Sequence, residues 1–344
     1  MPTLRVAIAG ATGYAGEELI RLLRQHPSVQ LTYLAASAKW DRPTPVSTIY
    51  PRVGHRLNCS IESLDVTRLI DACDMAFLAL PHGAAAAIVP ALLAAGKRVI
   101  DLSGDFRLRD PTAYPAWYRF THPHPELLTD ARVVYGLTEF HGGELPQARL
   151  VSNPGCYATG ILLACLPLFR ARVVTHPVLI VDAKSGLTGA GRKADPTLLY
   201  AEVAENLRAY KVNQHQHMPE ILQEIAQVTG QAPRMVFVPQ VIPVARGLIS
   251  MLYVNVTSEQ AVHEAYRAAY ASDAAPFIRL RPGMLPQLRD VVETNYCDIG
   301  WVHDASTGTM VVASALDNLT KGAAGQAIQN LNSMMGWNET TGLL

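Results

Sequence analysis

The N-terminus of the sequence joins an apolar strand pattern to a glycine-rich turn and a helix pattern. The apolar run Leu4–Ala9 leads into Gly10-Ala-Thr-Gly13-Tyr-Ala-Gly16, and helical periodicity covers Tyr14–Gln25. Glycines at such a turn let the backbone approach a pyrophosphate, while the N–H groups that open the helix face the anion. The spacing is G-x-x-G-x-x-G rather than the commoner G-x-G-x-x-G. We therefore predict a dinucleotide site that includes Gly10, Thr12, Gly13, Tyr14, Ala15 and Gly16.

Strand and helix patterns continue to alternate after this turn. Apolar strand patterns cover Gln30–Ala35, Met75–Leu80 and Arg98–Leu102, and a helical pattern covers Ala84–Ala95. Such alternation is typical of a parallel sheet with right-handed crossovers. The fold class that we predict is α/β, with a Rossmann-type doubly wound parallel sheet.

The character of the sequence changes after residue 150. Strand patterns at Pro177–Ala183, Met235–Ile242, Ile249–Val256 and Val291–Ile299 are interleaved with helical ones, which predicts a second α+β domain of mixed sheet. A long helical pattern, Asp317–Met335, is expected to pack back on the first domain. The predicted domains are residues 1–150 plus 315–344 for dinucleotide binding, and residues 151–314 for catalysis, substrate and oligomerisation.

Composition excludes several classes of partner. The formal net charge is 0, so no basic field favours nucleic acid or an acidic membrane surface, and no apolar run approaches a membrane span. The five cysteines are scattered without a C-x-x-C pair, and no signal-peptide pattern precedes the first strand, which predicts reduced thiols and a cytoplasmic location. His122, His124 and His141 lack further ligands at metal spacing, so no metal site is predicted.

One cysteine lies where a nucleophile would be expected. Cys156 follows a strand pattern and an Asn-Pro-Gly turn, and the apolar stretch Ile161–Leu168 comes next. If that stretch is helical, free N–H groups and the macrodipole at its start favour the thiolate. A lone cysteine beside an apolar helix is more often a small core residue. The turn and the dinucleotide signature together favour the catalytic interpretation.

The second strand pattern bears on the choice of cofactor. An NAD site usually has Asp or Glu there, about 20 residues past the turn, to hold the ribose 2′-hydroxyl. This strand runs into Leu34-Ala-Ala-Ser37-Ala-Lys39, with no acid before Asp41. Ser37 and Lys39 suit a 2′-phosphate, which predicts NADP. The alternative is that both are solvated loop residues.

Seven segments, in chain order, resemble the N-acetyl-γ-glutamyl-phosphate reductase family of arginine biosynthesis, within the aspartate-semialdehyde dehydrogenase superfamily. They are the glycine-rich turn, Asp101-Leu-Ser-Gly-Asp-Phe-Arg-Leu108, Tyr135-Gly-Leu-Thr-Glu139, Ser152-Asn-Pro-Gly-Cys-Tyr-Ala-Thr159, Ser185-Gly-Leu-Thr-Gly-Ala-Gly-Arg192, His215-Gln-His-Met-Pro-Glu-Ile221 and Asp317-Asn-Leu-Thr-Lys-Gly-Ala-Ala-Gly-Gln326. The likeness covers essentially the whole chain. Gln240 departs from the pattern, in which Pro-His is expected where Pro239-Gln240 stands.

The resemblance implies NADPH-dependent reduction of N-acetyl-L-glutamyl 5-phosphate to N-acetyl-L-glutamate 5-semialdehyde and phosphate. The Cys156 thiolate would form a thioester, and His217 would act as acid and base because imidazole titrates near neutrality. His215 and Glu220 are expected to bind or orient. The superfamily also implies a homodimer or homotetramer that forms through the second domain.

Several further residues are candidates for binding. Arg107 is the first choice for the substrate phosphate, because a guanidinium fork matches phosphate oxygens, with Arg192 and Arg246 in reserve. Residues expected to approach the cofactor or substrate are Ser185, Gly186, Gly189 and Asn318, the last through the nicotinamide amide.

Other functions stay open at this stage. Within the superfamily, the nearest alternatives are an aspartate-semialdehyde dehydrogenase and a reductase for the one-carbon-longer aminoadipyl phosphate. A non-catalytic nucleotide-binding regulator is a third. The combination of Cys156, His217 and the glycine-rich turn argues against that last alternative.

Overall fold

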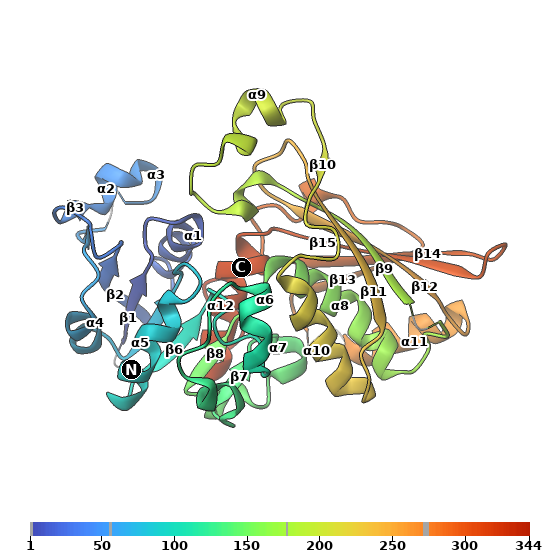
Figure 1. Ribbon diagram of the computed structural model, residues 1–344, viewed down its shortest axis with the longest axis horizontal. Helices are drawn as coiled ribbons and strands as arrows, with labels where there is room; N and C mark the ends of the chain where they lie inside the picture. Colours follow the sequence, from blue (N-terminus) through green and yellow to red (C-terminus); the bar gives the residue numbers. More distant parts are fainter. Residues whose placement is uncertain (1–2, 55–56, 177, 271–274) are drawn as a thin grey trace. The chain divides into compact units, whose positions relative to one another are not determined.

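The computed structural model describes residues 3–54, 57–176, 178–270 and 275–344 (Figure 1). The chain forms two compact units. One consists of Met1–Pro154 with Ala323–Leu344, and the other of Gly155–Gly322.

The first unit is built on an eight-stranded sheet of order β3-β4-β2-β1-β5-β6-β8-β7. All of its strand pairs are parallel except the short β3–β4 pair. The strands are β1 (Leu4–Ala9), β2 (Val29–Ala35), β3 (Thr44–Pro45), β4 (Ser60–Glu62), β5 (Met75–Leu78), β6 (Arg98–Asp101), β7 (Val133–Tyr135) and β8 (Leu150–Ser152). The order reverses between β1 and β5, so the predicted doubly wound sheet is confirmed.

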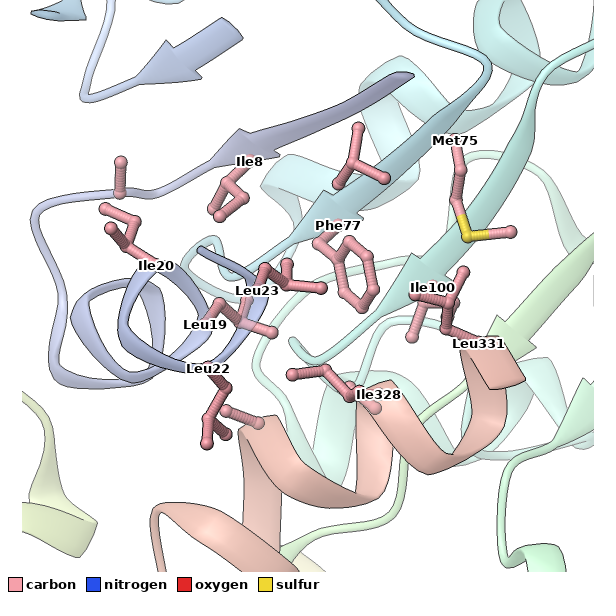
Figure 2. Close-up of a cluster of buried hydrophobic side chains, with 14 of the residues drawn as sticks. Ile8, Leu19, Ile20, Leu22, Leu23, Met75, Phe77, Ile100, Ile328 and Leu331 are labelled. Carbon is pink, nitrogen blue, oxygen red and sulfur yellow. The ribbon is translucent and has the colours of Figure 1, made fainter. Parts of the chain in front are cut away.

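Helices cover both faces of this sheet. They are α1 (Tyr14–Leu23), α2 (Val46–Ile49), α3 (Pro51–Gly54), α4 (Val66–Ala72), α5 (Ala84–Ala94), α6 (Tyr114–Trp117), α7 (Thr138–His141) and α12 (Gly325–Met334). Ile8 belongs to one apolar core and its neighbour Ala9 to another, because both faces of β1 are buried. Figure 2 shows the first core, where Ile328 of α12 lies near Phe77 of β5.

The second unit is built on a seven-stranded sheet of order β10-β11-β9-β12-β15-β14-β13. Pairs β11–β9 and β13–β14 are parallel and the others antiparallel, so the predicted mixed sheet is confirmed. The strands are β9 (Val178–Ser185), β10 (Arg208–Ala209), β11 (Arg234–Val241), β12 (Leu248–Asn255), β13 (Ile278–Pro282), β14 (Cys297–Asp304) and β15 (Thr309–Leu316).

One long helix forms the centre of the second unit. The helices are α8 (Cys156–Arg170), α9 (Tyr200–Val203), α10 (His217–Thr229) and α11 (Glu259–Ala269). Helix α8 packs on β12 and β15 and also on α10 and α11. Residues 157–168 are all buried, which explains why this segment is apolar on every side.

The structure corrects some of the predicted elements. Seven of the eight predicted strands agree within two residues at each end, although Pro177 lies outside the described residues. The predicted strand Val291–Ile299 is wrong, because a 3-10 turn at Leu288–Asp290 and further turns precede β14. The predicted helix Asp317–Met335 begins only with a π-helical turn at Thr320–Ala324, and α12 follows. Among the helices that the structure describes, none has both the length and the apolar character that a bilayer crossing requires.

Candidate active site

Cys156 is the first residue of α8. Gly155 caps the helix in an extended conformation, with φ −71° and ψ 150°, and no side chain caps this end. The thiol is half-buried, and it therefore lies among the free N–H groups at the positive end of a 15-residue helix. Burial raises the pKa of Cys73 to about 11 and also raises the pKa of Cys59 and Cys165. Those three thiols stand in surroundings that disfavour a thiolate.

The first turn of α10 brings an imidazole and a carboxyl group to the residue before Cys156. His217 Nε2 lies 3.9 Å from Glu220 Oε1, and Glu220 Oε2 accepts a hydrogen bond from the Gly155 N–H at 3.4 Å. An ideal Cβ on Gly155 would stand 2.3 Å from His217 Nε2. The imidazole therefore packs directly against the backbone that carries the thiol. Glu220 is fully buried and His217 nearly so.

His215 differs from His217 in its hydrogen bonding. The backbone N–H of His217 donates to His215 Nδ1 at 3.1 Å. Because Nδ1 accepts this bond, the neutral ring carries its proton on Nε2, which can then only donate. This geometry is compatible with the predicted binding role of His215, and the choice of His217 as the base stays a prediction.

A pocket of about 530 Å³ brings many of the predicted residues together within the second unit. Its walls include Cys156, His215 and His217, and also Ser185, Gly186 and Gly189. Gly186 is required by close packing, because a Cβ there would stand 2.9 Å from the Ala245 backbone. The volume falls in the range typical of small-molecule sites.

Two other predicted residues make hydrogen bonds that connect loops of the second unit. The Arg246 guanidinium donates to both oxygens of the buried Asp317 carboxylate, at 2.8 and 3.0 Å, and to Thr320 Oγ1 at 2.8 Å. Asn318 Oδ1 accepts from the Gly247 N–H, and its Nδ2 donates to Thr188 Oγ1. These bonds engage Arg246 and Asn318 in holding loops together. Arg192 is exposed.

The first unit contains the predicted dinucleotide turn. Gly10 has φ +90°, and a Cβ there would stand 2.1 Å from the Ala79 carbonyl oxygen. A Cβ on Gly16 would stand 2.3 Å from the Gly10 carbonyl oxygen, while Gly13 caps α1 without a side chain. Side chains are thus excluded at Gly10 and Gly16, and the turn fits a pyrophosphate at the helix N-terminus. Ser37 and Lys39 follow β2 and are exposed.

Arg107 lies in a buried polar group of the first unit. Its Nε donates to the Asn153 carbonyl at 2.8 Å and its Nη2 to the Leu102 carbonyl at 3.1 Å. Burial raises the pKa of Asp101, and the nearby Asp105 carboxylate raises it further. The hydrogen bond from Arg107 to the Asn153 carbonyl holds the backbone just before Pro154. Phosphate binding by Arg107 stays a prediction.

Comparisons with known proteins show the family to which this chain belongs. The family model described as semialdehyde dehydrogenase, NAD binding domain, matches residues 5–148, and the one described as semialdehyde dehydrogenase, dimerisation domain, matches residues 156–318. N-acetyl-gamma-glutamyl-phosphate reductases from a Geobacillus species and from Symbiobacterium thermophilum are 42% and 44% identical to this chain, over 99% of it and 98% of their own lengths. The chain belongs to the N-acetyl-gamma-glutamyl-phosphate reductase family.

Solved structures share the fold of this reductase family member at low sequence identity. Aspartate semialdehyde dehydrogenase II from Vibrio cholerae, complexed with ASA, has a TM-score of 0.70 at 18% identity, over 98% of this chain and 99% of that one. Aspartate semialdehyde dehydrogenase with NADP from Candida albicans has a TM-score of 0.65 at 15% identity, over 97% and 98%. These structures show the fold, whereas the 42% and 44% identical reductases show that the chain is an oxidoreductase. The match to the NAD binding domain model shows that its first unit binds a nicotinamide cofactor.

Sequence reasoning missed several side chains that line the pocket with Cys156. Among them are Tyr157, Arg208, Tyr210 and Lys211. Tyr157 immediately follows the cysteine, and the other three precede His215 by a few residues. Proximity to recognised motifs is a signal that could have found them. The described residues contain no group of three or more His, Cys, Asp and Glu that could hold a metal ion.

Proposed function

We propose that the chain reduces N-acetyl-L-glutamyl 5-phosphate with NADPH and releases N-acetyl-L-glutamate 5-semialdehyde and phosphate, a step of arginine biosynthesis. The observation that carries this proposal is the contact of His217 and Glu220 with Gly155, the residue before Cys156. It supports thiol chemistry because a nucleophile, a base and a group that orients the base stand together. The identities of 42% and 44% to reductases of that name support the choice of substrate.

In this mechanism, Cys156 Sγ attacks the acyl carbon of the substrate while His217 takes the thiol proton. The bond from the acyl carbon to the phosphate oxygen breaks, phosphate leaves with the electron pair, and a thioester remains on Cys156. The buried Glu220 carboxylate orients His217 and stabilises its charged form. We assign the Nε2–H of His215 to donate to a substrate oxygen, because its Nδ1 accepts from the His217 N–H.

A nicotinamide cofactor would be held by the turn that contains Gly10, Gly13 and Gly16, and when bound it would supply the hydride that reduces the thioester carbon. The resulting oxyanion then collapses to the aldehyde, and the carbon–sulfur bond breaks. Cys156 leaves as a thiolate and recovers its proton from His217. Glu220 and residues 157–168 of α8 are buried, which keeps bulk water from much of this arrangement.

NADP, rather than NAD, is the cofactor that we assign. Ser37 and Lys39 stand exposed after the end of β2, where the 2′-substituent of a bound ribose is expected in this fold. We assign residues 1–150 plus 315–344 to the cofactor, and residues 151–314 to catalysis and oligomerisation. The family models at 5–148 and 156–318 support the boundary near residue 150, and the second model extends to residue 318.

A homodimer, or a tetramer built from it, is the assembly that we assign. One exposed apolar row crosses five strands of the second sheet, because the strand register aligns Val236, Ile180, Tyr253, Val311 and Val302. Three of these side chains are 38%, 42% and 43% exposed, namely Val236, Ile180 and Val302. A continuous apolar row of this kind is typical of an interface. The name of the family model for this region, a dimerisation domain, supports a second copy as the occupant.

The proposed function is tested in the reverse direction, as phosphate-dependent oxidation of three semialdehydes with NADP. We expect N-acetylglutamate semialdehyde to be preferred over the aspartate and aminoadipate compounds. Preference for the aspartate compound would overturn the substrate assignment.

Variants then test the roles of individual residues. Cys156→Ala should lose activity by several orders of magnitude and still bind NADPH, as measured by fluorescence titration. His217→Ala should lower kcat by about 10²- to 10⁴-fold. A larger loss in His215→Ala than in His217→Ala would reverse their roles.

A further inference from the structure

Two positively charged side chains that have no assigned role line the pocket that contains Cys156. Arg208 and Lys211 are the arginine and lysine among its described lining residues, and Asp195 is the carboxylate. Asp195 already accepts bonds from the Thr197 N–H and Oγ1, which lower its pKa. The pocket wall therefore carries a surplus of positive charge.

Both cations make their hydrogen bonds to neutral partners, and Arg208 also interacts electrostatically with the nearby Asp195 carboxylate. Arg208 Nη2 lies 3.1 Å from Thr197 Oγ1, and Lys211 Nζ lies 3.1 Å from Gln216 Oε1. Neither takes part in an ion pair among the described residues, and both side chains are exposed. Their charges are therefore available to an anionic ligand.

The backbone that carries these cations is fixed to the sheet. Arg208 begins the edge strand β10, where it pairs with Val241 of β11. The Tyr210 N–H donates to the Pro239 carbonyl, and Asn213 Oδ1 accepts from the Phe237 N–H at 2.8 Å. A fixed backbone reduces the entropy that is lost when a ligand binds.

The sheet register places Arg208 on one side of the pocket. Arg208 pairs with Val241, and Val241 pairs in turn with Ser185 of β9, which lines the same pocket. Arg208 is thus two strands away from Ser185, about 10 Å between backbones. An elongated ligand that reaches the thiol with one end can meet the edge strand with the other.

We propose that Arg208 and Lys211 bind the carboxylate at the amino-acid end of the substrate. This inference rests on the proposed function, whose substrate carries that carboxylate and an acyl phosphate. The carboxylate stays with the enzyme through the thioester stage, whereas the phosphate departs when Cys156 attacks. A fixed pair of cations at the edge strand suits the group that must stay bound.

The reverse reaction separates the two anions, because semialdehyde and phosphate then bind as different molecules. We expect Lys211→Met and Arg208→Gln to raise KM for N-acetylglutamate semialdehyde about tenfold or more, and to leave KM for phosphate within twofold. Lys193→Met is the matched control, because Lys193 is exposed nearby and does not line the pocket. A raised KM for phosphate alone, or no change in either KM, would overturn the proposal.

A second measurement is independent of the substrate. Iodoacetate and iodoacetamide alkylate thiols alike but differ by one carboxylate, so their rate ratio at Cys156, followed by peptide mass spectrometry, reports the positive charge of the pocket. We expect the double variant of Arg208→Gln and Lys211→Met to lower this ratio several-fold, and Lys193→Met to leave it unchanged. A ratio unchanged in the double variant contradicts the anion subsite. Failure of the wild type to oxidise any semialdehyde would instead contradict the proposed function.

Discussion

Replacing Gly155 with alanine should displace His217 without disturbing the backbone. The added methyl carbon would stand 2.3 Å from Nε2 and 2.5 Å from Cε1 of His217, and 2.6 Å from Glu220 Oε1. Non-bonded heavy atoms need about 3.5 Å, so the imidazole must retreat by about 1 Å. A displacement of that size at a catalytic group can cost about 10²-fold in rate. The φ and ψ of Gly155, −71° and 150°, are open to alanine, so backbone strain adds nothing.

The assay is phosphate-dependent oxidation of N-acetylglutamate semialdehyde, with thermal unfolding measured in parallel. We expect Gly155→Ala to lower kcat about 10²-fold and to lower stability by about 1–3 kcal/mol through overpacking. Gly143→Ala is the matched control, because Gly143 is exposed and a Cβ there meets nothing within 4 Å. If Gly155→Ala kept kcat within twofold of the control, the assignment of His217 as the base would be refuted.

Three further predictions test other parts of the structure. Gly322→Ala would place a Cβ 2.8 Å from Cys156 Cβ, so the rate of Cys156 alkylation should change while Gly143→Ala leaves it unaltered. Burial lowers the pKa of His26, whose Nε2 bonds to Asn332 Oδ1, so the native state binds fewer protons than the unfolded state. The contribution of neutral His26 to the free energy of unfolding is complete above about pH 6.5 and declines below it. Between pH 8 and pH 5.5, urea unfolding should therefore show a smaller loss of unfolding free energy in His26→Gln than in the wild type. Tyr253→Asp should convert the assembly to monomers in sedimentation velocity, and an unchanged sedimentation coefficient would contradict the proposed interface.

Local patterns in the sequence were enough to predict the strands and the glycine-rich turn of the first unit. Leu4–Ala9 is a strand as predicted, and the positive φ of Gly10 explains why glycine stands at the turn that follows it. The start of α8 at Cys156 could also be predicted, because the Pro-Gly turn and the apolar run that follows are both local signals. These features depend on residues that are near each other in the chain.

The features that sequence reasoning missed depend on contacts between distant residues. Val291–Ile299 resembles a strand, yet Glu293 takes φ +63° and its N–H donates to the Asp317 carboxylate at 2.7 Å. The same carboxylate engages Arg246, which the sequence offered as a phosphate ligand. No periodicity along the chain reveals which buried carboxylate will pair with a given arginine. Only the fold shows that Arg246 donates to Asp317.

The most direct test of the account is a single turnover in the absence of phosphate. With N-acetylglutamate semialdehyde and NADP but no phosphate, the Cys156 thioester should form and have no acceptor. We expect a burst of NADPH equal to one per active site, with the acyl group found on the Cys156 peptide by mass spectrometry. A full burst in Cys156→Ala, or the acyl group on another cysteine, would contradict the central claim that Cys156 is the nucleophile.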